Sequence, residues 1–157
     1  MKVTRTTKKL SLTVIIAVAL FAALARPHCQ IPCGIYDDQA RLDSIAEHIV
    51  TIEKSMKMIT TLTAEEKPDM NQIVRWVQNK DDHADEIAHI VTYYFMAQRL
   101  SPVEKSAAPA YEKYVNKLGL LHQMLVYSMK AKQTTNLANV KKLESLLAEF
   151  KTAYVEP

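Results

Sequence analysis

The chain has 157 residues, which is enough for one domain and little more. It contains only two glycines, too few for the many turns of an all-β protein, whereas helix-favouring residues such as Ala, Leu, Lys and Glu are plentiful. The formal charge of +3 is unevenly distributed, because residues 1–27 carry five cations and no acid and the remainder is slightly acidic. No basic stripe is present, so we expect no nucleic-acid partner.

Residues 1–27 have the pattern of a secretory leader. A basic start is followed by an apolar run over residues 10–25 that only Ser11 and Thr13 interrupt. Ala23-Leu24-Ala25 then offers small residues at the spacing of a cleavage site. The alternative is an uncleaved membrane anchor, but the run is shorter than the roughly 20 residues that span a bilayer. We therefore expect the leader to be removed and the protein to be exported, to the periplasm or the extracellular space.

The segment "HCQIPCGIY", residues 28–36, holds both cysteines of the chain, a histidine and one of the two glycines. Three interpretations are open. An even cysteine count in an exported chain favours a disulfide between Cys29 and Cys33. A thiol redox pair is the second, although its usual spacing is C-x-x-C. A metal site is the third.

The metal interpretation depends on where the leader is cut. A cut just before His28 would bring together a free α-amine, the imidazole, the Cys29 amide nitrogen and the thiolates of Cys29 and Cys33. Nitrogen and sulfur donors in a tetragonal arrangement suit nickel(II) or copper(II), and a tetrahedral set suits zinc.

The rest of the chain, residues 37–157, carries apolar residues at helical spacing. The four runs are Ile45 to Ile59, Ile73 to Tyr94, Tyr111 to Leu125 and Val140 to Tyr154. The expected boundaries are a break at residues 63–69, a helix start near Ala107 or Ala110, and a cap at Thr134 or Thr135. Long amphipathic helices with short connections predict an all-α fold, an antiparallel, up-down four-helix bundle with an N-terminal metal-hook loop.

The residues His-Cys-x-x-Pro-Cys-Gly-x-Tyr, after a leader and before a helical body, resemble the nickel hook of the nickel superoxide dismutase family. The resemblance implies one nickel ion per subunit, a four-helix-bundle subunit and a homohexamer. It also implies that superoxide is disproportionated to dioxygen and hydrogen peroxide through a Ni(II)/Ni(III) cycle. Carried onto this chain, His28 supplies the amine and an axial imidazole, Cys29 its amide nitrogen and thiolate, and Cys33 its thiolate. Tyr36 would be a catalytic residue at the open face, holding an anion or water near the metal.

The resemblance further implies a second catalytic tyrosine, Tyr94, with Tyr93 as the alternative. An acid that supports the axial imidazole in the family corresponds to Asp43. Its arginine neighbour falls at Asn79 or Lys80, where this chain has no arginine.

Maturation partners are also implied. Cleavage after Ala25 would leave Arg26 and Pro27 ahead of His28, so we expect a leader peptidase that cuts after Pro27, or a second trimming step. A nickel-delivery factor is a further expected partner. If the leader serves only maturation, the protein would be cytoplasmic.

Two other functions are compatible with the sequence alone. One is a non-enzymatic helical protein that binds nickel or copper with the same hook. The other is a small helical interaction domain with a Cys29–Cys33 disulfide. A di-metal site in the bundle core is not expected, because it needs two Glu-x-x-His pairs and only Glu86 and His89 form one.

Overall fold

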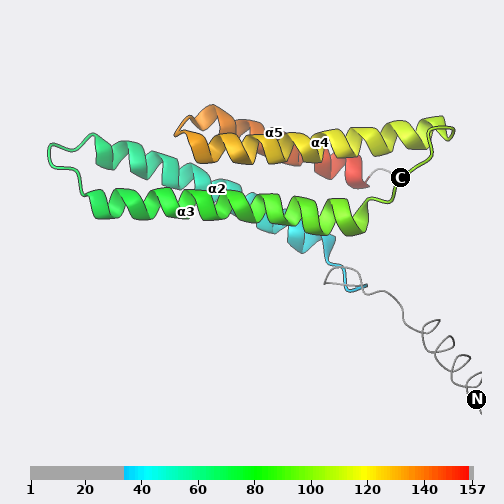
Figure 1. Ribbon diagram of the computed structural model, residues 1–157, viewed down its shortest axis with the longest axis horizontal. Coiled ribbons are helices and arrows are strands. Elements are labelled where there is room, and N and C mark those ends of the chain that lie inside the picture. Colours follow the sequence, from blue (N-terminus) through cyan, green and yellow to red (C-terminus); the bar gives the residue numbers. More distant parts are fainter. Residues whose placement is uncertain (1–33, 156–157) are drawn as a thin grey trace, which may run out of the picture.

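The computed structural model describes residues 34–155, which form long helices packed side by side (Figure 1). In order they are α2 (Asp38–Thr63), α3 (Met70–His89), the π-helix η1 (Ile90–Arg99), α4 (Ala108–Gln133) and α5 (Leu137–Val155). Because η1 continues α3 without a break, four helical rods make up the bundle. Each short turn, after α2 and after α4, returns the chain alongside the helix that it has just left (Figure 1). The predicted all-α four-helix bundle is confirmed.

The core follows the apolar stripes expected from the sequence. Every member of the predicted α2 stripe is buried: Ile45, Ile49, Ile52, Met56 and Ile59. At the end of the bundle near the start of α2, the core becomes aromatic. Phe95 is fully buried there, with the rings of Phe150 and Tyr154 edge-on to it at 5.1 and 5.5 Å between centroids. Burial of these large side chains is the main favourable contribution to folding.

Helix starts are set by short polar side chains. The carboxylate of Asp37 accepts a hydrogen bond from the amide of Ala40, and that of Asp69 accepts one from Gln72, so both cap free N–H groups. Helix α4 begins at Ala108, next to the expected start near Ala107 or Ala110, and Pro109 lies in its first turn. The expected cap at Thr134 or Thr135 was wrong, because the side chain of Asn136 accepts the hydrogen bond from Ala138 at 2.9 Å.

The second rod ends in a wider helix. In η1 the backbone closes i→i+5 hydrogen bonds, and the last of them runs from the Leu100 amide to the Phe95 carbonyl at 2.9 Å. Leu100 then adopts an extended conformation that ends the helix. Such segments are rare and often occur at functional sites.

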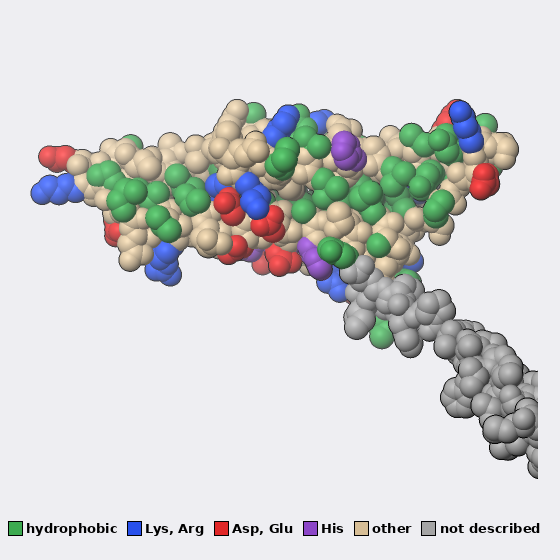
Figure 2. Space-filling model, in the orientation of Figure 1, with side chains coloured by type: hydrophobic (Ala, Val, Ile, Leu, Met, Phe, Trp, Pro, Cys, Tyr) green, Lys and Arg blue, Asp and Glu red, His purple; other side chains and the backbone are tan. Residues whose placement is uncertain are grey.

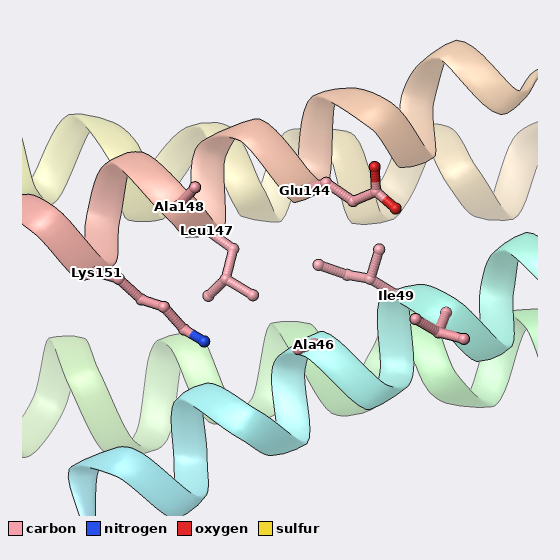
Figure 3. Close-up of a pocket in the computed structure, with 7 residues that line it drawn as sticks. Ala46, Ile49, Glu144, Leu147, Ala148 and Lys151 are labelled. Carbon is pink, nitrogen blue, oxygen red and sulfur yellow. The ribbon is translucent and has the colours of Figure 1, made fainter.

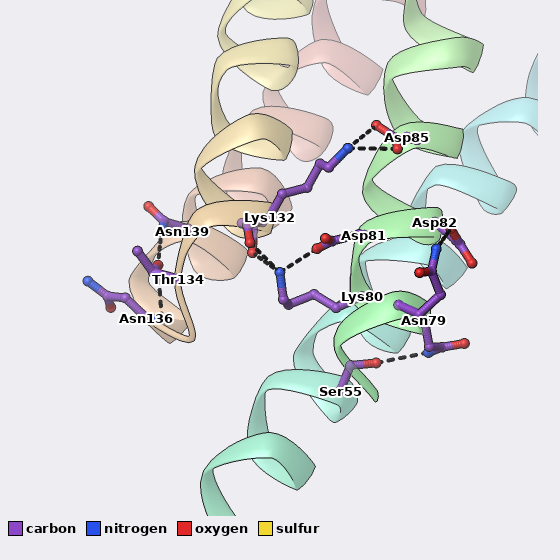
Figure 4. Close-up of polar contacts among 12 residues, drawn as sticks. Ser55, Asn79, Lys80, Asp81, Asp82, Asp85, Lys132, Thr134, Asn136 and Asn139 are labelled. Carbon is purple, nitrogen blue, oxygen red and sulfur yellow. Dashed lines mark hydrogen bonds and ion pairs between the residues drawn. The ribbon is translucent and has the colours of Figure 1, made fainter. Parts of the chain in front are cut away.

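A buried lysine closes the end of α4 (Figure 4). Lys80 is only 2% exposed, and its Nζ donates to the Ala131 carbonyl at 2.9 Å and to the Lys132 carbonyl. Its third partner is Asp81 Oδ1 at 2.6 Å. These carbonyls are among the four that a helix end leaves without intrahelical partners, and a cation there also favours the helix dipole. Lys80 therefore ties α3 to the carboxyl end of α4.

None of the helices in residues 34–155 is both long and apolar enough to cross a bilayer.

Candidate metal centre

The three predicted metal ligands, His28, Cys29 and Cys33, lie outside the described residues, as does the predicted leader. The described residues begin at Gly34, directly after Cys33, and so include the last three residues of the segment 28–36. Tyr36, the predicted catalytic residue within this segment, is among the described residues.

Gly34 bends the chain as it leaves the cysteines. Its φ angle is +74°, in the left-handed region where residues with a side chain are strained. No atom lies within 4 Å of the place a Cβ would occupy, so backbone conformation rather than space requires glycine here. The Cys-Gly pair in the sequence thus has a conformational reason.

The ring of Tyr36 lies against two side chains of η1. The guanidinium carbon of Arg99 is 4.3 Å from the ring centroid, within the range of a cation–π contact. Tyr94 meets the same ring edge-on, with centroids 6.0 Å apart and planes at 79°. Tyr36 is still 40% exposed, so it is anchored on one side and open to solvent on the other.

Beneath Tyr36, the carboxylate of Asp38 accepts four hydrogen bonds from three side chains. Oδ1 accepts from the Tyr94 hydroxyl at 2.7 Å and from Arg99 Nε at 2.8 Å. Oδ2 accepts from Arg99 Nη2 at 2.7 Å and from the Tyr154 hydroxyl at 2.9 Å. The arginine is therefore bound by two parallel hydrogen bonds, the strongest geometry for such a pair. We call Tyr36, Asp38, Tyr94, Arg99 and Tyr154 the Asp38 cluster.

The charges in this cluster are fixed at neutral pH. Hydrogen bonding from Arg99 holds the pKa of Asp38 below its usual value, against the opposing effect of burial. Burial, reinforced by the hydrogen bond to Asp38, raises the pKa of Tyr94 to about 12. Burial also raises the pKa of Tyr154. The carboxylate is thus ionised and both phenols stay protonated, so all four hydrogen bonds are retained.

Tyr94, the second predicted catalytic residue, is brought next to Tyr36 but is 4% exposed, with its hydroxyl bonded to Asp38. The alternative, Tyr93, is 46% exposed and its ring contacts His89 at 4.6 Å. Of the two, Tyr94 is the one that contacts the end of the segment 28–36.

The residues that correspond to the family's supporting pair are not brought together among the described residues. Asp43 accepts from Gln39 at 2.8 Å and lies 3.6 Å from Lys151. Asn79 donates to Ser55 at 2.9 Å, and Lys80 caps α4 as described above (Figure 4). Ser55 is 12 residues beyond Asp43 on α2, which corresponds to about 18 Å along the helix axis.

Sequence reasoning missed Asp38, Arg99 and Tyr154. They come from three different helices, and 116 residues separate Asp38 from Tyr154. One local signal exists: Asp37-Asp38 supplies a second carboxylate beside the one needed for the helix cap. The cation that pairs with Asp38 is set by tertiary packing, which local sequence patterns do not predict.

A second guanidinium lies next to the ring of Tyr94. Besides Arg99, the guanidinium carbon of Arg41 lies 5.3 Å from the centroid of the Tyr94 ring. Arg41 is exposed at the surface of the first turns of α2.

Two of the described histidines pair with each other. His48 and His83 share a hydrogen bond between their Nδ1 atoms at 2.7 Å, between α2 and α3. Burial and the neighbouring His83 lower the pKa of His48. Within residues 34–155, no group of three or more His, Cys, Asp or Glu side chains is arranged to hold a metal ion.

Comparison with known proteins gives one match. A family model described as nickel-containing superoxide dismutase matches residues 22–157, a range that includes the segment 28–36 and the whole bundle. No curated protein and no solved structure matches the chain.

Proposed function

Because the chain belongs to the nickel-containing superoxide dismutase family, we propose that residues 28–36 are its nickel hook, with His28, Cys29 and Cys33 as the metal ligands. The donor set fits the metal: an amine, an imidazole, an amide nitrogen and two thiolates are the nitrogen and sulfur donors that tetragonal nickel(II) prefers. Gly34 supports this assignment, because its left-handed backbone turns the chain directly after Cys33.

The enzyme is a nickel-dependent oxidoreductase that disproportionates superoxide to dioxygen and hydrogen peroxide, with one nickel ion per subunit. Bound nickel supplies the one-electron redox chemistry. The protein contributes the surroundings. In this proposal the exposed Arg41 supplies positive charge that attracts the superoxide anion, whereas the charge of Arg99 is paired with Asp38.

We propose that Tyr36 holds an anion or a water molecule at the open face of the site. Its ring is anchored on η1 while 40% of the residue remains exposed, which suits a group that meets an incoming ligand. Tyr94 acts differently in this proposal. Its hydroxyl is bonded to Asp38 and stays protonated, so it orients the ring of Tyr36 rather than exchanging protons at neutral pH.

The ligand set requires that maturation end at His28. We propose that residues 1–27 are a leader removed by a peptidase, and that a delivery factor supplies nickel. N-terminal sequencing of the mature protein tests this directly. A first residue of His28 supports the proposed ligand set, whereas a mature chain that starts at Arg26 would contradict it.

We also propose a cellular location from the pattern of the leader. With a secretory pattern at the start, the protein is exported to the periplasm or outside the cell; if the leader serves maturation alone, it is cytoplasmic. Fractionation of cells that express the full chain, followed by detection of the mature form, distinguishes the two.

We propose that the subunits form a homo-oligomer, a hexamer by resemblance. Large apolar side chains remain exposed on the helices, among them Val50 at 60% and Val74 at 61%. Green hydrophobic side chains run along the face shown in Figure 2. Between α2 and α5, Ile49, Val50 and Leu147 line an open groove of about 320 Å³ (Figure 3). Such surfaces suit subunit contacts, and native mass spectrometry would give the number of subunits.

The observation that carries the function is the family match over residues 22–157. The test is to purify the mature protein and measure its nickel content together with superoxide consumption. Stoichiometric nickel with turnover is expected. Bound metal without turnover would favour a metal carrier, and metal-free protein with oxidised cysteines would favour a structural disulfide.

The ligand assignment has its own test. Cys29→Ser and Cys33→Ser should each abolish activity, because the hydroxyl that replaces the thiolate is a poor ligand for nickel. The far-ultraviolet circular dichroism should be unchanged, since both positions precede the helices of residues 34–155. Activity that survives either substitution would contradict the assignment.

A further inference from the structure

Tyr36, the last residue of the proposed hook, is seated on the bundle by two side chains. Arg99 covers its face and Tyr94 meets it edge-on. Both of these side chains donate to the same oxygen, Oδ1 of Asp38, at 2.8 and 2.7 Å. We propose that Asp38 is a positioning residue of the metal centre: it holds Arg99 and Tyr94 where they seat Tyr36, and so fixes the end of the hook on the bundle. This inference rests on the proposed assignment of residues 28–36 as the hook.

The π-helix makes this arrangement possible. Tyr94 and Arg99 are five residues apart, and in an α-helix they would point about 140° away from each other. The i→i+5 hydrogen bonds of η1 bring residues five apart to the same side. One carboxylate can therefore bind both side chains, because the wider helix places Tyr94 and Arg99 on the same side.

The carboxylate also determines where the arginine lies. The side chain of Arg99 is 28% exposed, and both of its hydrogen bonds to Asp38 are at 2.8 Å or less. Without the negative charge, a partly exposed guanidinium gains more from water than from the ring of Tyr36. Asp37 does not replace Asp38, because its own carboxylate caps α2 through the amide of Ala40. The position of Arg99 over Tyr36 thus depends on Asp38.

Chain length carries this effect to the metal ligands. Tyr36 is three residues after Cys33, and three residues span at most about 11 Å even when fully extended. Seating Tyr36 therefore keeps Cys33 within about 11 Å of a fixed point on the bundle. Releasing Tyr36 removes this limit.

The test uses the fact that Cys29 and Cys33 are the only thiols of the chain, so a thiol reagent reports on the hook alone. In the reduced, metal-free full chain, Asp38→Asn should raise the rate of thiol labelling about tenfold, the effect of losing a contact of cation–π strength. The matched control is Asp85→Asn. Asp85 also holds a cation of another helix, Lys132 at 2.7 Å, but neither residue is part of the Asp38 cluster. Its labelling rate should equal that of the unchanged chain.

A double-mutant cycle separates positioning from general loosening. Tyr36→Ala should raise the labelling rate as Asp38→Asn does, and the double variant should add nothing further, because both remove the same anchor. Tyr36→Phe should keep the slow rate, since the ring and not the hydroxyl makes the contacts. If Asp38→Asn does not fold, Arg99→Lys replaces it in the cycle, because lysine keeps the charge but loses the paired hydrogen bonds and the planar stacking.

The outcomes are distinct. Equal labelling rates in the unchanged chain and the folded Asp38→Asn chain would overturn the inference, and so would additive effects in the cycle. In the nickel-loaded enzyme, the inference predicts that Asp38→Asn retains nickel while its visible absorption shifts and its turnover falls. If the unchanged mature protein binds no nickel, the hook assignment fails, whatever the labelling rates show.

Discussion

Lys80 and Asp38 each tie helices of this bundle together, and their surroundings are built differently. Lys80 is buried, and two of its three partners are backbone carbonyls at the end of α4. Asp38 is half-buried, and all of its partners are side chains, two of which continue to the exposed ring of Tyr36. Lys80 donates to free carbonyls at the end of one helix. Asp38 fixes the positions of Tyr94 and Arg99, which contact the exposed ring of Tyr36.

The difference separates stability from function within one small domain. A charge that satisfies only backbone groups can change the free energy of folding without changing the site. A charge that holds other side chains determines where those side chains point. The substitutions below should therefore affect different measurements.

The largest loss of stability should follow Lys80→Met. The methionine fills most of the space but leaves the carbonyls of Ala131 and Lys132 without their donor and removes the partner of Asp81. Such a buried loss should lower the free energy of unfolding by about 3 kcal/mol. Urea unfolding measures it. Nickel content and turnover of the folded fraction should not change, and a loss of either would remove the contrast with Asp38.

Asp38→Asn should have a smaller effect on stability, about 2 kcal/mol at neutral pH, since the amide keeps some hydrogen bonds but loses the charge. The effect should depend on pH. Because the folded pKa of Asp38 is lowered, its ionised form contributes stability above the unfolded value near 3.8, and this is lost as the pH falls through the folded pKa.

Urea unfolding of both proteins at a series of pH values tests that prediction. The difference between them should be constant near neutrality and shrink below about pH 4. His48, whose pKa is also lowered, weakens both proteins as the pH drops below about 6.5, so it cancels in the difference. A difference that does not change with pH would mean that the charge of Asp38 contributes nothing.

The smallest effect on the bundle should come from Gly34→Ala. Its φ of +74° strains any side chain, at a cost of about 1 kcal/mol, but Gly34 precedes the first helix cap. The bundle should therefore unfold at nearly the same urea concentration, while nickel affinity, measured by competition with a chelator, falls about fivefold. A large change in unfolding would show that the turn belongs to the bundle.

Local patterns predicted the fold well because helices depend on local spacing and capping. The apolar stripe of α2 and the start of α4 near Ala107 both follow from the sequence. The proposed ligands were also found locally, because a hook places its donors within a few residues. Their positions lie outside the described residues, so they stay a prediction.

What the sequence did not provide are the contacts made by long side chains between helices. Lys80 was considered as a support for the hook, but it reaches the end of α4, more than fifty residues further along the chain. The sequence does not single out Arg99, because its contacts with Asp38 and Tyr36 depend on a π-helix that the apolar periodicity does not predict. In both cases the partner is chosen by packing, which spacing along one helix does not encode.

The hydrogen bond from Tyr154 to Asp38 also has a consequence for the order of folding. It joins residues 116 apart, whereas the bonds from Arg99 to the same carboxylate join residues 61 apart. Contacts of such separation form late, since a long loop must close first. During synthesis α5 emerges after the other described helices, so Asp38 gains the Tyr154 donor after those from Tyr94 and Arg99. The carboxylate that holds Arg99 and Tyr94 thus has its full set of donors only after α5 has packed against the other helices.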